Sequence, residues 1–214
     1  MHTKITGASI LSLAFFAAII GLFTLPLLPA EVASHWNAAG QVDDYMPKLM
    51  GVFLMPCLLL VVFIVWKLIP RIEPMQKNFL TFRESYNGFF LVLAFFLFYV
   101  YDITIGTNLG WQFDFRVALA PAVALLLFAS AELMKHTKRN FLVGIRTPWT
   151  LSSDKVWKRT HELAAYLFYF CAISALAGAV YPDFLMVYIL VPILGTVLIT
   201  VLYSYIEFKR VGAK

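Results

Sequence analysis

Ionisable side chains gather in two polar segments that lie between long apolar stretches. Residues 140–157, NFLVGIRTPWTLSSDKVW, include two Trp, a Pro, a Gly and several charges. Residues 29–48 include His35, Asp43 and Asp44, which are possible metal ligands at a spacing that matches no standard metal site. The sequence contains no glycine-rich phosphate loop, paired-histidine zinc motif or nucleophile elbow. We therefore expect no catalytic residue, metal or cofactor.

The composition indicates a membrane protein. Of the 214 residues, 61% are hydrophobic and 14% are charged, and the mean hydropathy is +0.80. A soluble domain has roughly 25% charged residues. One water-soluble core of this size cannot bury so much apolar sequence, so the bilayer is the expected solvent.

Six apolar runs are long enough to cross a bilayer, for which about 20 residues are needed. The lipid interior forces each span to satisfy its own backbone hydrogen bonds, which favours helices. The first run exceeds the apolar region of about 7–15 residues found in a signal peptide and is expected to be retained. The predicted fold class is an all-α integral membrane protein of six helices arranged as three hairpins, with runs at residues 5–28, 49–69, 86–105, 115–134, 163–181 and 184–206.

The basic residues predict the orientation of these helices. With six spans, 15 of the 17 Lys and Arg residues fall on the side of the two termini, and only Lys48 and Arg116 fall on the other side. Loops rich in Lys and Arg stay in the cytoplasm, so both termini are expected there. The basic excess therefore reflects topology and contact with anionic lipid. It is poor evidence for direct nucleic-acid binding.

The chain is expected to form one compact membrane domain. Residues 1–69 would supply two helices and the outer polar segment, and residues 70–214 would supply four helices and the inner polar segment. Each returning helix has an early proline, at Pro56, Pro121 and Pro192. These positions fit either a duplicated hairpin or the ordinary tolerance of membrane helices for proline. Kinks at the three positions could open a cavity.

The outer segment is expected to form an ordered cap over the helices. Residues 37–40 form a natural turn, in which Gly40 can take a positive φ. Trp36 and Tyr45 suit the membrane–water interface. Together with Asp43 and Asp44, these aromatic side chains would suit a cationic amphipathic ligand arriving from outside.

The inner segment can be interpreted as an interfacial helix that binds lipid nonspecifically or as a rigid folded loop. Gly144 permits a turn, and Pro148 biases Thr147 towards extended backbone. Ser152 or Ser153 would cap a following helix. These features favour the folded loop, in which we expect Arg146 to be partly buried. Its expected partner is Glu132 or a carbonyl group at a helix end.

The inner segment resembles the motif of the SdpI family of bacterial immunity membrane proteins. The outer segment is similar to a small N-terminal domain that is often joined to this motif. On the inner motif lie Asn140, Gly144, Arg146, Thr147, Pro148, Trp149, Thr150, Leu151 and Trp157. On the outer motif lie His35, Trp36, Asn37, Gly40, Asp43 and Lys48.

The resemblance implies a multi-pass protein of a bacterial or archaeal cytoplasmic membrane. It further implies protection from a secreted, membrane-active peptide toxin, with the outer motif residues as ligand-binding candidates. A soluble transcriptional repressor in the cytoplasm is the second implied partner. The sequence leaves two other classes open: a transporter or channel for a small molecule or lipid, and a membrane enzyme. The enzyme ranks last because the polar residues lie in loops on opposite faces of the membrane.

Overall fold

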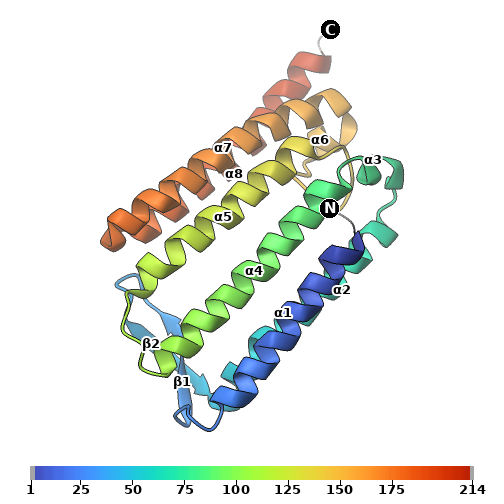
Figure 1. Ribbon diagram of the computed structural model, residues 1–214. Coiled ribbons are helices and arrows are strands. Elements are labelled where there is room, and N and C mark those ends of the chain that lie inside the picture. Colours follow the sequence, from blue (N-terminus) through green and yellow to red (C-terminus); the bar gives the residue numbers. More distant parts are fainter. Residues whose placement is uncertain (1–2, 213–214) are drawn as a thin grey trace.

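The computed structural model describes residues 3–212 and contains the six long apolar helices that the sequence predicts (Figure 1). A short 3₁₀ turn, Pro182–Phe184, precedes the last helix. The expected all-α class is confirmed. The six helices are α1 (Thr3–Thr24), α2 (Lys48–Ile72), α4 (Arg83–Asn108), α5 (Phe115–His136), α7 (Asp154–Val180) and α8 (Leu185–Gly212).

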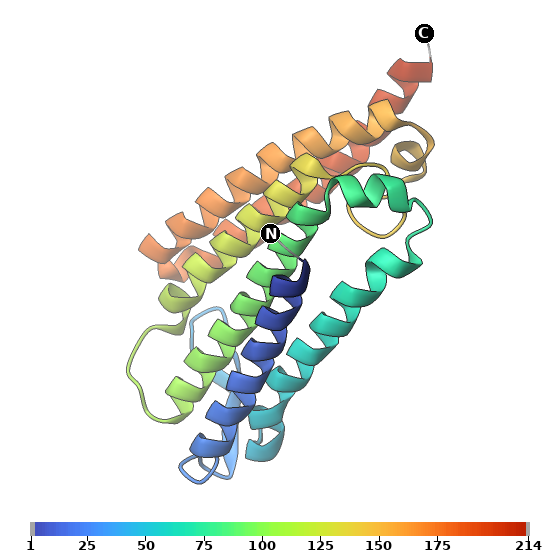
Figure 2. The same ribbon diagram turned by 45° about the vertical axis from the view of Figure 1, so that its right-hand side comes forward.

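The start of α1 and the end of α8 lie at the same end of the bundle (Figures 1 and 2). Two short helices, α3 (Gln76–Thr81) and α6 (Pro148–Ser152), lie at this end, which we call the inner end. Most of the basic residues lie in the inner loops or in the inner ends of the long helices, whereas Lys48 and Arg116 lie at the opposite end. Lys214, which also counts towards the basic side, lies outside the described residues. That the inner end faces the cytoplasm stays a prediction.

The outer segment forms a β-hairpin that the sequence did not predict. Strand β1 (Glu31–Trp36) pairs antiparallel with β2 (Val42–Pro47), and the register shifts on either side of His35. The predicted turn connects the strands, and Gly40 has a φ of 75°. The Asn37 carbonyl accepts a hydrogen bond from the Gly40 N–H at 2.9 Å. An ordered outer cap is therefore present, built from strands.

The helices pack as two groups (Figure 2). One buried apolar cluster joins α1, α2 and α4 and includes Ile10, Leu59 and Tyr86. A second cluster joins α5 and α7 and is flanked by Ile189 and Ile193 of α8. Contacts between α4 and α5 connect the two groups. The packing thus groups α4 with the first two helices. Many other large apolar side chains are exposed on the helices, which is typical of a membrane-facing surface.

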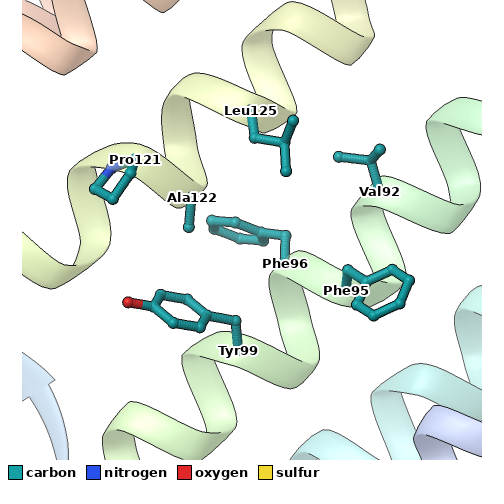
Figure 3. Close-up of a pocket in the computed structure, with 7 residues that line it drawn as sticks. All are labelled: Val92, Phe95, Phe96, Tyr99, Pro121, Ala122 and Leu125. Atoms are coloured by element: carbon teal, nitrogen blue, oxygen red, sulfur yellow. The ribbon is translucent and has the colours of Figure 1, made fainter.

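The three prolines lie inside α2, α5 and α8, and each helix continues past its proline. A cavity of about 390 Å³ lies beside Pro121, between α4 and α5 (Figure 3). Phe96 and Tyr99 extend from α4 towards Ala122 of α5 and line this cavity with Leu125. The cavity wall is therefore mostly hydrocarbon.

Candidate functional site

An apolar groove of about 320 Å³ lies beneath the β-hairpin, and we call it the outer groove. The strands contribute His35 and Trp36 to its wall, and α4 contributes Tyr101 and Thr104. The other lining residues are Ala33, Ser34, Met46, Gly51, Leu54, Met55, Val100, Phe115, Leu119 and Met186. Residues from four helices and both strands thus line one groove. Two of them, His35 and Trp36, belong to the predicted outer motif.

Two contacts fix the hairpin on the helices around the outer groove. The rings of Trp36 and Phe115 stack with centroids 4.0 Å apart and planes 7° apart. The side-chain amide of Asn108, at the end of α4, accepts a hydrogen bond from the Ala33 N–H at 2.7 Å and donates one to the Ala33 carbonyl at 3.3 Å. The hairpin is therefore attached to both helices that form the second outer turn.

The other predicted outer residues mostly shape the hairpin. Asn37 Oδ1 accepts hydrogen bonds from the backbone N–H groups of Ala39 and Gln41, at 2.9 and 3.0 Å. Lys48 Nζ donates to the carbonyls of Leu25 and Leu28, which follow the end of α1. Both side chains thus satisfy backbone groups, and neither lines the outer groove.

His35 and Asp43 are brought together across the two strands of the hairpin. His35 Nδ1 lies 2.6 Å from Asp43 Oδ1, and both side chains are well exposed to solvent. Asp44 is also exposed, and its carboxylate accepts a hydrogen bond from the Tyr45 N–H. Glu31 adds a further exposed carboxylate at the start of β1. The outer surface of the hairpin is therefore acidic.

The arginine of the outer end is neutralised by neighbouring acids. Arg116 forms ion pairs with Asp114 at 2.9 Å and with Asp183 at 2.7 Å. Its hydrogen bonds hold the pKa of the Asp114 carboxyl below the usual range. Gly40 lies against Arg116, since a Cβ atom at Gly40 would be 2.8 Å from Arg116 Nε. This arginine therefore ties the hairpin turn to the third outer turn.

At the inner end, residues 137–161 fold into a compact unit that we call the inner knot. Asn140 is fully buried and organises it. Its Nδ2 donates to the carbonyls of Lys138 and Val143, at 2.8 and 2.9 Å, and its Oδ1 accepts from the N–H groups of Leu142 and Val143. One side chain thus satisfies four backbone groups of the turn.

Trp157 and His161 form the centre of the inner knot. Their rings stack with centroids 4.0 Å apart, and Trp157 Nε1 donates to the Thr137 carbonyl at 3.2 Å. His161 Nδ1 donates to the Trp157 carbonyl, and Nε2 accepts the Ile145 N–H at 2.9 Å. Gly144, with a φ of 107°, leaves room for this ring. The hydrogen bonds fix a neutral histidine whose role here is to hold the loop.

Helix α6 begins with a reciprocal cap that the sequence analysis missed. Thr147 Oγ1 accepts a hydrogen bond from the Thr150 N–H, and Thr150 Oγ1 accepts one from the Thr147 N–H. Thr147 is extended, as predicted, and Pro148 is the first residue of a short helix that the sequence did not predict. The cap of α7 is Ser153, which is one of the two expected candidates.

Helix α8 covers one side of the inner knot. Thr147 Oγ1 lies 3.1 Å from Ser204 Oγ, and the ring of Trp149 lies 5.0 Å from that of Tyr205. Arg159 of α7 forms an ion pair with the buried carboxylate of Glu207. The inner motif therefore depends on the last helix for its packing.

The expected pair between Arg146 and Glu132 is not among the ion pairs within residues 3–212. Arg146 is exposed rather than partly buried, and its Nη1 donates to the Phe141 carbonyl at 2.9 Å. Glu132 instead accepts a hydrogen bond from Tyr169, and His136 lies 3.7 Å from it. The loop reverses direction at Gly144, so the Arg146 side chain lies against the carbonyl group of Phe141 in the same loop.

The first inner loop docks on the inner knot through residues that the sequence analysis did not select. Glu73 is 1% exposed, and its carboxylate accepts the N–H groups of Met75 at 2.9 Å and Phe141 at 3.1 Å. Asn78 Nδ2 donates to the Arg139 carbonyl at 2.9 Å. These bonds join segments about 60 to 70 residues apart.

A polar cavity of about 340 Å³ lies on the surface of the inner knot. Four basic side chains, two acids and the edge of the Trp157–His161 stack line it. Its residues are Asn78, Lys135, Thr137, Lys138, Arg139, Asp154, Trp157, Lys158, His161 and Glu162. Its mixed charges suit the recognition of a polar partner surface.

Both motifs lie in regions of the chain that match models of known protein families. Residues 136–204 match the model of the SdpI/YfhL protein family, and residues 13–60 match a domain of unknown function, DUF1648. The immunity protein SdpI of Bacillus subtilis (strain 168) is 25% identical over 214 residues, which cover 99% of each chain. No solved structure matches the chain. The resemblance to the SdpI family that the inner motif predicted is confirmed.

Proposed function

With an SdpI-family region at residues 136–204 as the premise, we propose that this chain is a multi-pass membrane immunity protein. Its outer groove binds a membrane-active peptide toxin, and its inner knot signals the bound state to a soluble regulator in the cytoplasm. The relative that is similar over the whole chain is named an immunity protein, which supports the general role.

The outer groove is the observation that carries the recognition half of the proposal. It combines an apolar wall of about 320 Å³ with an acidic hairpin at its rim. Glu31 and Asp44 are exposed there, and Tyr45 is 57% exposed. A cationic amphipathic peptide presents the complementary features, because its apolar face requires burial and its charges are attracted by carboxylates.

The route to the inner end runs along α5. Phe115 stacks on Trp36 at the start of this helix. Thr137, which follows its last residue, accepts the indole hydrogen bond of Trp157. A ligand that moves the hairpin therefore acts on a helix whose far end holds the centre of the inner knot. For such coupling between the two ends, the ligand must bind more tightly when the helix is in one of two positions than when it is in the other.

The polar cavity of the inner knot supports the choice of a soluble partner. Lys135 and Lys138 lie beside Asp154 and Glu162 in its wall. Charged groups of both signs around one hollow favour an oriented protein contact, since each sign rejects a mismatched partner. A transcriptional repressor held at the membrane would fit this surface through its own charged side chains.

Protection of a susceptible bacterial host tests the recognition half. Cells that express the chain are challenged with a panel of membrane-active peptide toxins, and survival is compared with that of the empty host. Ser34→Trp fills the groove, whereas Ala38→Trp places the same ring on the exposed turn outside it. We expect protection by the wild type and Ala38→Trp and its loss in Ser34→Trp. Equal protection by both variants, at equal membrane levels, would reject the groove as the site.

A transporter for a lipid-like molecule is the second candidate. The apolar cavity between α4 and α5 in Figure 3 favours it, because this cavity lies within the membrane-spanning part of both helices. Val92 and Phe95 line it along with Pro121. Liposomes that contain the purified protein and transfer a labelled lipid or amphiphile, in the absence of any toxin protection, would favour this function over immunity.

A further inference from the structure

We propose that a groove between the inner ends of α1 and α2 binds one anionic phospholipid. Basic side chains hold its phosphodiester, and an apolar trough holds one acyl chain. The groove has a volume of about 660 Å³, within the range of about 300–1,000 Å³ for small-molecule sites. Its lining residues are Thr3, Lys4, Gly7, Ala8, Leu11, Phe63, Trp66, Lys67, Pro70, Arg71 and Arg83. This proposal does not depend on the immunity function.

Four cations from three helices surround the groove, namely Lys4, Lys67, Arg71 and Arg83. The ion pairs found among residues 3–212 include none of them. In contrast, Arg116, Arg139, Lys158 and Arg159 each have a carboxylate partner. The positive charge of this groove is therefore concentrated and is available to an anion.

Arg83 supplies the most specific part of the site. Its guanidinium lies between 5.4 and 5.7 Å from the ring centroids of Trp66, Phe79 and Tyr86. Its Nε is buried and has no hydrogen-bond partner within the described residues 3–212. A buried donor is normally satisfied. A phosphate oxygen is the acceptor that arginine binds best, because the planar fork matches the geometry of the phosphate.

The trough is apolar because small residues of α1 face aromatic residues of α2. A Cβ atom at Gly7 would lie 3.0 Å from the ring of Trp66, so glycine allows the two helices to approach closely here. Ala8, Leu11 and Phe63 complete the apolar part of the wall, and Lys67 Nζ lies 5.6 Å from the centroid of the Phe63 ring. An acyl chain can lie along this wall while the headgroup of the same lipid contacts the basic side chains.

The combination of features selects a lipid over other anions. Basic pockets between membrane helices at the cytoplasmic face are suited to anionic headgroups. A free phosphate ion would make no use of Ala8, Leu11 or Phe63. An acidic soluble protein would contact the cations but not a trough that follows membrane-spanning helices. Only an anionic amphiphile uses both halves of the groove.

Thermal unfolding of the full chain in a neutral detergent tests the proposal. Phosphatidylglycerol, phosphatidylcholine and soluble glycerol 3-phosphate are each titrated. We expect saturable stabilisation by phosphatidylglycerol alone. Lys67→Gln with Arg71→Gln should weaken its apparent affinity roughly thirtyfold, because two basic groups near the headgroup are lost. The control, Lys77→Gln with Lys155→Gln, removes the same charge from exposed inner positions outside the groove and should match the wild type.

A second pair of variants tests the trough without touching the cations. Ala8→Phe fills the groove, and Ile5→Phe adds the same ring at an exposed position outside its wall. We expect only Ala8→Phe to lose the phosphatidylglycerol effect. Equal losses in groove and control variants would overturn the proposal, as would equal stabilisation by glycerol 3-phosphate. Native mass spectra that show an acidic protein instead of lipid on the wild type would also overturn it.

Discussion

The imidazole of His161 lies 4.0 Å from the ring of Trp157, with the two planes 16° apart, and its Nε2 accepts the N–H of Ile145. This relationship closes the inner knot, because Ile145 follows the turn at Gly144. A Cβ atom at Gly144 would lie 2.6 Å from His161 Nε2. Glycine is therefore required there both by the backbone and by the ring.

Replacement of Gly144 by Ala should destabilise the protein more than the same change at Gly110. Both glycines have a positive φ, of 107° and 87°, so each variant should lose about 1–3 kcal/mol to backbone strain. Of the two, only Gly144 adds a steric clash, since no atom of the described part of the chain lies within 4 Å of a Cβ at Gly110. Melting temperatures in detergent measure the difference. In a His161→Ala background the excess cost of Gly144→Ala should shrink, since the contact with Trp157 at 3.3 Å remains. An unchanged excess would mean that the His161 ring is not the cause.

Loss of the Glu73 carboxylate should separate the two inner loops. Glu73→Ala leaves the N–H of Phe141 without its buried acceptor, which should cost about 1–3 kcal/mol. We expect a lower melting temperature and faster proteolysis within the inner knot. Glu162→Ala is the control, because Glu162 is exposed. If both variants behaved alike, the loops would not depend on this contact.

The ion pair between Arg159 and Glu207 should contribute far more than the pair between Lys158 and Glu162. Glu207 is 1% exposed, so Arg159→Gln strands a buried carboxylate and should cost about 3–5 kcal/mol. The exposed pair should contribute about 0–1 kcal/mol, so Lys158→Gln should be nearly neutral. Thermal unfolding compares the two variants. Similar melting temperatures would mean that Glu207 finds another partner.

The orientation of the bundle can be checked by cysteine labelling. In a background without Cys57 and Cys171, Ala39→Cys should react with a membrane-impermeant thiol reagent in intact cells, because the hairpin is expected outside. Lys155→Cys should react only after permeabilisation. Lys155 is a suitable inner position because it is exposed, whereas Ser153 caps α7. The reverse labelling would exchange the outer and inner roles.

The helices were predictable because hydropathy acts over about 20 residues and needs no tertiary information. The hairpin was not, because its strands are six residues long and its register shifts around His35, so the sequence lacks a clean alternation. The turn at Gly40 was predictable because it depends on local backbone freedom.

In the inner motif, too, local features were predictable and long-range contacts were not. The cap at Ser153, one of two candidates, and the extended backbone of Thr147 before Pro148 were predicted because both depend on local signals. The reciprocal Thr147–Thr150 cap was missed because its third residue is not the usual Glu or Gln. Glu73 was missed because its partner Phe141 lies 68 residues away. The sequence offered one signal for Glu73, namely that this carboxylate directly follows an apolar helix.

If a membrane-active peptide binds in the outer groove, as we propose, site-specific photocrosslinking should capture it there. A photoreactive side chain replaces Ser34, which lines the groove, or Gln41, which is exposed beside the turn. Intact cells that express each variant are irradiated with a labelled toxin that the wild type resists. Binding in the outer groove predicts a crosslink from position 34 that unlabelled toxin abolishes, and little crosslinking from position 41. Equal crosslinking at both positions, or none at position 34 in protected cells, would contradict it.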